Sequence, residues 1–126
     1  MLCNTGFILK QLGNFDLLVC SFGLLQQEVE LLKSINWANI VIDEAQAIKN
    51  IQTKRAQAAN SLNSQFKFIT TGTPIENHLG ELWSLFEFIN PGLLGSYSRF
   101  NSEFIQPIEK NDQAKRKHLK KLIKPF

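Results

Sequence analysis

Residues 39–50 read NIVIDEAQAIKN, and residues 66–74 read FKFITTGTP. Residues 39–43 form a short apolar run rich in β-branched side chains, which is typical of a parallel strand covered on both faces. Residues 66–71 have the same strand character. Polar residues follow each run directly. Because ligands of parallel sheets bind at the carboxyl ends of strands, both predicted strands end where a site could form.

The sequence on either side of these strands alternates between strand and helix patterns. Residues 16–21, DLLVCS, predict a further buried strand. Helices are predicted over residues 24–35, 53–62, 79–90, 98–105 and 113–123. The alternation is typical of an α/β domain with a parallel sheet flanked by helices. The last two helical stretches follow Pro91 with no strand between them, so we interpret them as a C-terminal helical appendage.

Composition places the chain among ordinary soluble globular domains. It has 126 residues, of which 44% are hydrophobic and 20% charged, enough for one compact core. Disordered and membrane-spanning classes are excluded, since no run approaches the ~18 apolar residues of a membrane helix. Cys3 and Cys20 lack the spacing of a metal site. We interpret both as reduced thiols and Cys20 as a small core residue.

Charge is unevenly distributed along the chain. The net charge is +3, yet residues 110–126 hold seven Lys or Arg against one Asp, while residues 1–109 hold seven basic and ten acidic residues. The basic residues Lys117, Lys120, Lys121 and Lys124 lie around the apolar residues Leu119, Leu122 and Ile123. Such a helix is expected to pack its apolar stripe on the body and turn its lysines outward. The lysines then either face a polyanion or form a solvated surface.

Asp43 and Glu44 are the most informative polar residues. Carboxylates at the end of a buried strand can serve a nucleotide site, where one holds Mg²⁺ and the other orients or deprotonates the attacking water. They can also act as acidic residues capping the next helix. After the second strand, Gly72 permits backbone conformations that other residues disfavour, and Pro74 pre-sets a turn. The TGTP segment therefore suits a tight loop.

Two strings together resemble a known family. Residues 41–50, VIDEAQAIKN, and residues 70–95, TTGTPIENHLGELWSLFEFINPGLLG, are similar to motifs II and III of the SWI/SNF family of helicase-like DNA translocases, a branch of the DEAD/DEAH-like helicase superfamily. The resemblance runs from about Phe15 to Phe126. It implies a partial RecA-like ATP-binding lobe at residues 1–95, with motifs Ib, II and III, and a truncated helical protrusion at residues 96–126.

The resemblance implies roles for residues of motifs II and III. Asp43 is expected to bind the Mg²⁺ of Mg-ATP, and Glu44 to position the hydrolytic water. Gln46 is expected to sense the nucleotide or the facing lobe. The segment implied to couple the nucleotide site to the DNA cleft consists of Thr71, Gly72, Thr73 and Pro74.

Two further pairs of residues are expected to contact nucleic acid, although the stretches that match the family's motifs are shorter there. Ser21 and Phe22 occupy positions similar to motif Ib, where a Ser followed by an aromatic residue lies near the tracked DNA strand. Lys49 and Asn50 match the extension after motif II and are expected to face DNA or the cleft. His78 and His118 stand alone and are expected to be surface residues rather than metal ligands.

The function implied is ATP hydrolysis coupled to movement on duplex DNA, in partnership with a second ATPase lobe of the same parent chain. No GxxxxGK[ST] phosphate loop occurs in the 126 residues, so we expect an interior fragment of the first lobe that is inactive alone. The PIENHLGELW context favours a bacterial cytoplasm over a nucleus, and no membrane association is expected.

Two alternatives stay open on the sequence. One is a noncatalytic nucleic-acid-binding or scaffold module, in which the basic tail binds phosphates and the acids are structural caps. The other is a lobe of an RNA helicase, against which the TGTP and LGELW strings speak, because such helicases usually carry Ser-Ala-Thr in motif III.

Overall fold

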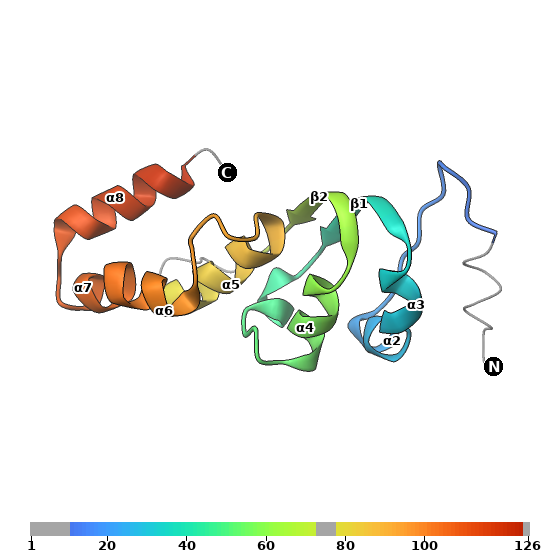
Figure 1. Cartoon of the computed structure of the whole chain (residues 1–126), viewed down its shortest axis with the longest axis horizontal. Coiled ribbons are helices and arrows are strands. Elements are labelled where there is room, and N and C mark those ends of the chain that lie inside the picture. The colour runs from blue at the N-terminus through green and yellow to red at the C-terminus, as the bar shows by residue number, and fades with distance from the viewer. Residues whose placement is uncertain (1–10, 73–77, 125–126) are drawn as a thin grey trace.

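The computed structural model describes residues 11–72 and 78–124 (Figure 1). Figure 1 shows the two strands and the helices α2 to α4 toward one end of the molecule, α6 to α8 toward the other, and α5 between them. The elements are α2 Phe22–Gln27, α3 Val29–Lys33, β1 Asn36–Ile42, η1 Ala45–Ile48, α4 Lys54–Asn60, β2 Asn63–Ile69, α5 Leu79–Ile89, α6 Tyr97–Phe100, η3 Asn101–Ile105, α7 Gln106–Glu109 and α8 Gln113–Ile123. Among them η1 is a 3₁₀ turn and η3 a π-helical turn.

The sheet consists of β1 and β2, which are parallel neighbours joined through η1 and α4. Ile40 lies opposite Lys67, and Val41 opposite Phe68. The predicted α/β class with a parallel sheet flanked by helices is therefore confirmed. Both strands begin three residues earlier than the apolar runs, because residues 36–38 and 63–65 also belong to the hydrogen-bonded ladder.

Only one face of this sheet is covered within the described residues. Ile42 is buried in a cluster with side chains of α2, α3, η1, α4 and α5. On the other face Val41 is 64% exposed, Phe66 61% and Phe68 52%. The expectation of a strand covered on both faces is thus wrong here, because the helices that contact the sheet belong to a single cluster on one side of it.

Small residues let the helices approach the covered face of the sheet. Ala45, Ala56 and Ala59 are completely buried, and Ile48 is nearly so. Where side chains are this short, backbones can come close with no void between them. This first core holds the buried residues Leu25, Leu32, Ile42, Ala45, Ile48, Ala56, Ala58, Ala59, Leu85 and Phe88.

A second core lies among α5 to α8 and is rich in aromatic residues. Trp83 and Phe86 on α5 pack with Phe100 and Phe104, and the rings of the last two are 5.5 Å apart. The Trp83 indole N–H donates to the Gly95 carbonyl at 3.0 Å. The buried members are Leu82, Trp83, Phe86, Leu94, Phe100, Phe104, Ile105, Ile108 and Leu119. Leu82, Trp83 and Phe86 form a buried stripe on α5, the helix predicted over residues 79–90.

Short polar side chains start four of the helices. Oxygens of Ser21, Thr53, Ser96 and Asp112 accept hydrogen bonds from backbone N–H groups of the first turns of α2, α4, α6 and α8. Such caps satisfy donors that have no partner inside the helix. The bounds predicted for the last helix, 113–123, agree with α8.

Two predicted elements differ from the structure. Residues 16–21 form no strand, and Leu17 and Val19 are largely exposed, as is Cys20, so the assignment of Cys20 to the core is also wrong. This segment pairs with neither β1 nor β2, which are the only strands within 11–72 and 78–124. The single helix expected over 24–35 is divided at Glu28, whose backbone leaves the helical region.

The connection from α5 to α8 is irregular. Gly92 and Gly95 adopt positive φ values of 82° and 70° after Pro91, a conformation that favours glycine. The π-helical turn of η3 precedes Pro107, whose ring nitrogen has no proton to donate. No helix in the described part of the chain is long and apolar enough to cross a membrane.

Candidate functional site

The ends of β1 and β2 are joined by backbone hydrogen bonds beyond the strands themselves. The Thr70 N–H donates to the Ile42 carbonyl at 2.8 Å, and the Ala45 N–H donates to the Thr70 carbonyl at 2.9 Å. The DEAQ segment and the segment after β2 therefore lie side by side at the carboxyl edge of the sheet. Parallel pairing makes this possible, because it brings both strand ends to the same edge.

Asp43 is held in place at this edge. Its Oδ1 accepts hydrogen bonds from the Thr70 hydroxyl and from the Glu44 backbone N–H, the latter at 3.0 Å. These bonds, that of Thr70 first, hold the pKa of the Asp43 carboxyl below its ordinary value, because they favour the charged form. The side chain is exposed, and neither bond uses Oδ2. An oriented, ionised carboxylate thus faces solvent.

Glu44 has a backbone conformation that is rare for its residue type. Its φ and ψ are 54° and 53°, in the left-handed region. For residues other than Gly, Asn and Asp this conformation is uncommon and costs about 1–3 kcal/mol. Strain of this kind persists where the surrounding bonds fix it, and it gathers at functional sites. It turns the chain sharply from β1 into η1.

Gln46 connects the segment after β1 with the segment after β2. Its side-chain amide donates to Oε2 of Glu44, and its Oε1 accepts from the Thr71 hydroxyl at 3.2 Å. Glu44, Gln46 and Thr71 thus form a continuous hydrogen-bonded chain. A movement of the segment after β1 would therefore shift the segment after β2, and the reverse, because the Gln46 amide is hydrogen-bonded to both.

The loop after β2 is described as far as Gly72. Thr71 is half-buried, and Gly72 is exposed. Gly72 does not adopt a positive φ, and a Cβ placed on it would meet nothing within 4 Å, so its backbone makes no use of glycine's special freedom. Thr73 and Pro74, also assigned to this loop from the sequence, lie outside the described residues.

Ser21 and Phe22 take no part in the hydrogen bonds described above, and each stabilises the fold. The Ser21 hydroxyl caps α2 by accepting from the Leu24 N–H at 3.2 Å. Phe22 is half-buried against the first core. Their assignment to nucleic acid stays a prediction.

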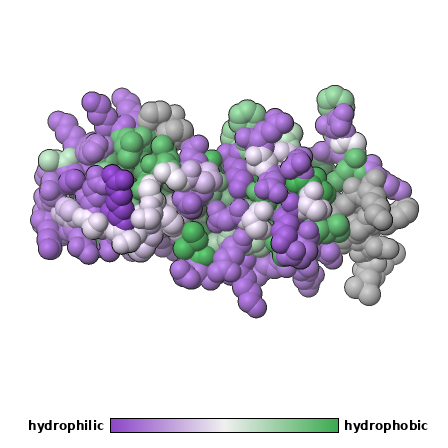
Figure 2. Space-filling view, viewed as in Figure 1, coloured by the Kyte–Doolittle hydropathy of each residue, from purple (hydrophilic) through white to green (hydrophobic). Residues whose placement is uncertain are grey.

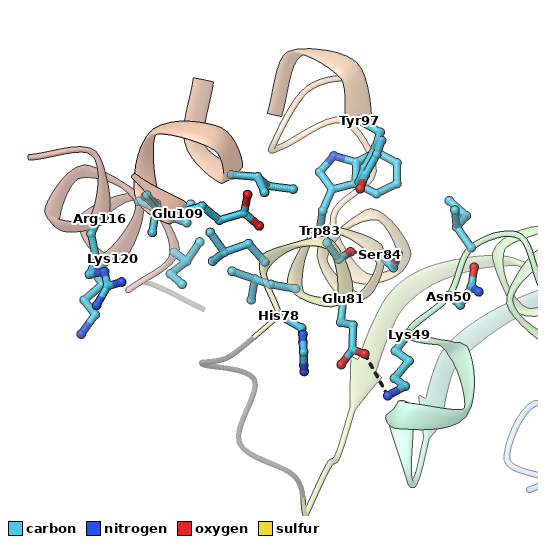
Figure 3. A pocket seen from close by; sticks show the side chains of 18 of the residues that line it. Lys49, Asn50, His78, Glu81, Trp83, Ser84, Tyr97, Glu109, Arg116 and Lys120 are labelled. Atoms are coloured by element: carbon cyan, nitrogen blue, oxygen red, sulfur yellow. Dashed lines mark hydrogen bonds and ion pairs between the residues drawn. The ribbon is translucent and has the colours of Figure 1, made fainter. Parts of the chain in front are cut away.

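Lys49 and Asn50 also have partners within the chain. The Lys49 ammonium lies 2.8 Å from a carboxylate oxygen of Glu81, on the first turn of α5 (Figure 3). The Asn50 side chain accepts from the Gln52 N–H at 3.0 Å, which forms a turn before α4. A contact of either residue with DNA stays a prediction. His78 and His118 are exposed, as expected.

The donor set fits Mg²⁺ bound together with a nucleotide. Mg²⁺ prefers oxygen ligands, and in phosphate-transfer sites it takes one or two carboxylates while phosphates and water supply the rest. Asp43 offers an ionised carboxylate whose Oδ2 is not used by the bonds from Thr70 and Glu44. In residues 11–72 and 78–124 no three His, Cys, Asp or Glu side chains gather into a metal site of their own.

Several features of the site were not predicted from the sequence. Thr70 orients Asp43, but nothing in the sequence distinguishes it from the other polar residues of the TTGTP segment. The left-handed conformation of Glu44 has no local signal, since Glu is not among the residues that favour it. Glu81 could have been suggested by its place in the first turn of a helix, but its pairing with Lys49 depends on how α5 packs.

Comparison with known proteins shows which family the chain matches. The family model of the SNF2-related domain matches residues 7–126. YwqA of Bacillus subtilis, named as an ATP-dependent helicase/translocase, is 44% identical over 114 residues, which cover 90% of this chain and 12% of YwqA. The TATA-binding protein-associated factor mot1 of Schizosaccharomyces pombe is 39% identical over 108 residues, or 86% of this chain and 6% of mot1. The chain thus corresponds to a small part of each relative.

Two solved structures share the fold. The Sulfolobus solfataricus SWI2/SNF2 ATPase core in complex with dsDNA superposes with a TM-score of 0.78 at 50% identity, covering 83% of this chain and 22% of that one. The ATPase core domain from the same organism gives a TM-score of 0.78 at 46% identity, covering 92% and 24%. The parallel sheet and its helices therefore match part of a RecA-like ATPase lobe.

Proposed function

Because the chain belongs to the SNF2-related domain family, we propose that it works as part of an ATP-dependent DNA translocase. In this proposal the carboxyl edge of the sheet is the chain's contribution to the ATP site. The observation that carries it is a pair of hydrogen bonds, from Thr70 to Asp43 and from Thr71 to Gln46. These bonds join the segment similar to motif II with the segment similar to motif III at one edge of the sheet. Ligands of parallel sheets bind at such edges.

Asp43 and Glu44 have separate roles in the proposed reaction. Asp43, oriented by Thr70, holds the magnesium of Mg-ATP through its carboxylate. That ion, when bound, offsets negative charge on the phosphates. Glu44 orients the attacking water and can take its proton at a carboxylate oxygen. The bond from Gln46 keeps the Glu44 side chain turned toward the segment after β2.

The loop after β2 is proposed to pass the state of the nucleotide to the DNA cleft. Gln46 senses the state at Glu44 and passes it to Thr71 through the amide. Gly72, and by sequence Thr73 and Pro74, continue this segment. Its partner across the cleft is the second ATPase lobe of the longer protein.

Duplex DNA is the proposed track. The S. solfataricus core, whose structure was solved with dsDNA, supports this choice for a chain that is 50% identical to it over the shared region. Ser21, Phe22, Lys49 and Asn50 are the proposed contacts. The B. subtilis relative supports a bacterial cytoplasm as the setting.

The test uses a longer protein that contains this chain together with a phosphate-binding loop and second lobe. Glu44→Gln should lower DNA-stimulated ATP hydrolysis by at least about 100-fold, the usual scale for loss of a general base. Nucleotide binding, measured with a fluorescent ATP analogue, should change little. Glu30→Gln, on the exposed face of α3, is the matched control and should leave hydrolysis unchanged.

Two outcomes would contradict the proposal. Hydrolysis that survives Glu44→Gln would favour the noncatalytic module, with the acids as structural caps. DNA-stimulated hydrolysis by the 126-residue chain alone would show that the site is built from other residues, because its sequence has no phosphate-binding loop.

A further inference from the structure

A large groove lies away from the proposed ATP site. It has a volume of about 1540 Å³ and lies between α5, the segment after η1, and the helices α7 and α8. Figure 3 shows Lys49 and Glu81 on one side of it and Arg116 and Lys120 on the other. Asp43, Glu44 and Thr70 are not among its lining residues. Whatever binds there would not touch the proposed catalytic carboxylates.

One wall of the groove carries a stripe of positive charge. Arg116, Lys120 and Lys124 line it from α8 and its C-terminal end. They are four residues apart, so they lie along one side of the helix over about 12 Å. Within residues 11–72 and 78–124 none of the three forms an ion pair. Their charge is therefore available to a ligand.

The floor of the groove is apolar. Figure 2 shows hydrophobic side chains gathered between the hydrophilic outer surface of α8 and the middle of the molecule. The partly exposed apolar residues lining the groove include Leu79 and Ile123, and the buried core residues Leu82, Ile105, Ile108 and Leu119 lie beneath them. An apolar floor beside a charged rim suits an amphipathic polypeptide, whose apolar side chains fill the floor while its charges meet the rim.

The opposite side of the groove disfavours a nucleic-acid backbone. Glu81 lines it and is already paired with Lys49, and Glu109 adds a second, exposed carboxylate. Phosphates lying along the groove would approach both acids, whereas a peptide can place polar or basic residues there. The outward lysines Lys117 and Lys121 do not line the groove, so the basic helix has two distinct charged faces.

From this geometry we infer that the groove between α5 and α8 is a docking site for an acidic amphipathic segment of a partner protein. Its acidic residues would pair with Arg116, Lys120 and Lys124. Its apolar residues would cover the partly exposed side chains of Leu79 and Ile123, beneath which the second core lies. The inference shares no residue with the proposed ATP chemistry of Asp43, Glu44 and Gln46. It competes with the DNA contacts proposed for Lys49 and Asn50, which also line the groove, and the duplex measurement below separates the two.

The test measures binding of a designed peptide to the full chain. The probe is a fluorescently labelled helical peptide of about 18 residues with Leu on one face and Glu at positions i, i+4 and i+8, long enough to span the basic stripe. Anisotropy should show saturable binding. The double variant Arg116→Glu/Lys120→Glu should weaken binding at least about tenfold, because attraction becomes repulsion along the rim.

Matched variants separate this site from general charge attraction. Lys117→Glu/Lys121→Glu makes the same charge change on the other face of α8 and should alter affinity less than about twofold. A peptide with Lys in place of Glu should bind the Arg116→Glu/Lys120→Glu variant better than it binds the unaltered chain. Circular dichroism checks that each variant keeps its helices.

Three results would overturn the inference. The first is equal weakening by both double variants, and the second is no saturable binding of the peptide. The third uses a labelled 20-base-pair DNA duplex: if it binds and loses affinity with Arg116→Glu/Lys120→Glu while the peptide does not bind, the groove serves nucleic acid. Intact hydrolysis by a longer protein with the groove variants would leave the proposed ATP site standing in every case.

Discussion

The sheet end and the helical end of the molecule are built on different principles. Around the sheet, alanines and medium-sized aliphatic residues bring short helices close to one face, while Val41, Phe66 and Phe68 remain exposed on the other. At the helical end, large aromatic rings fill a core among α5, α6, η3 and α8. Each end thus buries a core, but within the described part of the chain the sheet is covered on one side only.

This difference suggests separate roles for the two ends: the exposed face of the sheet suits contact with another surface, and the aromatic core suits stability. A contiguous exposed apolar surface, such as that of Val41, Phe66 and Phe68, is typical of an interaction site rather than of a surface that faces solvent. The helical end buries Trp83, Phe86, Phe100 and Phe104, which suits a rigid support. The helix α5 joins the two, since Leu85 and Phe88 belong to the first core and Trp83 and Phe86 to the second.

The largest expected effect on stability concerns the aromatic core. Phe100 has no exposed surface, so Phe100→Ala should lower the free energy of unfolding by about 3–5 kcal/mol. The measurement is urea unfolding followed by circular dichroism and by tryptophan fluorescence. Because α5 links the cores, both signals should keep one common midpoint; a shift in the helix signal alone would show that the two ends unfold separately.

A neighbouring pair of residues tests the one-sided covering of the sheet. Ile42→Thr places a hydroxyl in the first core and should cost about 2–3 kcal/mol. Val41→Thr, one residue away on the exposed face, should change stability by no more than about 0.5 kcal/mol. Similar losses for the two variants, compared by chemical unfolding, would mean that both faces of β1 are covered in solution.

Gly72 gives a smaller effect at the candidate site. Since its φ is not positive and a Cβ would meet nothing within 4 Å, Gly72→Ala should raise the free energy of unfolding by about 0.4–1 kcal/mol through the unfolded chain. Stability is measured on the 126-residue chain. A clear loss of stability would show that the loop in solution uses a backbone conformation open only to glycine.

Lys67 supplies the smallest effect, which depends on pH. Burial lowers the pKa of its ammonium, which lies over the Phe88 ring at 4.8 Å from the ring centre. The unfolded chain therefore holds this proton to higher pH than the folded chain. Stability should rise as pH increases from the lowered pKa toward the ordinary lysine pKa. Lys67→Met should flatten this rise in pH-dependent thermal unfolding, whereas Lys54→Met, at the exposed first residue of α4, should preserve it.

Much of the fold was predictable because it depends on local patterns. The amphipathic stripe of α5, the Asp cap of α8 and the β-branched run of β1 each specify an element within a few residues. Residues 16–21 show the limit of this reasoning. Their apolar run fits a strand, but a strand exists only where a neighbouring chain segment offers hydrogen bonds, and the segment pairs with neither β1 nor β2.

The candidate site divides in the same way. The sequence by itself placed Asp43 and Glu44 at the end of one strand and Thr70 to Gly72 at the end of another, because residue order decides which side chains stand at each strand end. Only the tertiary structure decided that Thr70 holds Asp43, that Gln46 joins Glu44 to Thr71, and that Lys49 pairs with Glu81. The left-handed backbone of Glu44 is likewise a feature of the folded chain. The other contacts depend on parallel pairing and on the packing of α5, because these bring together residues more than twenty positions apart in the sequence.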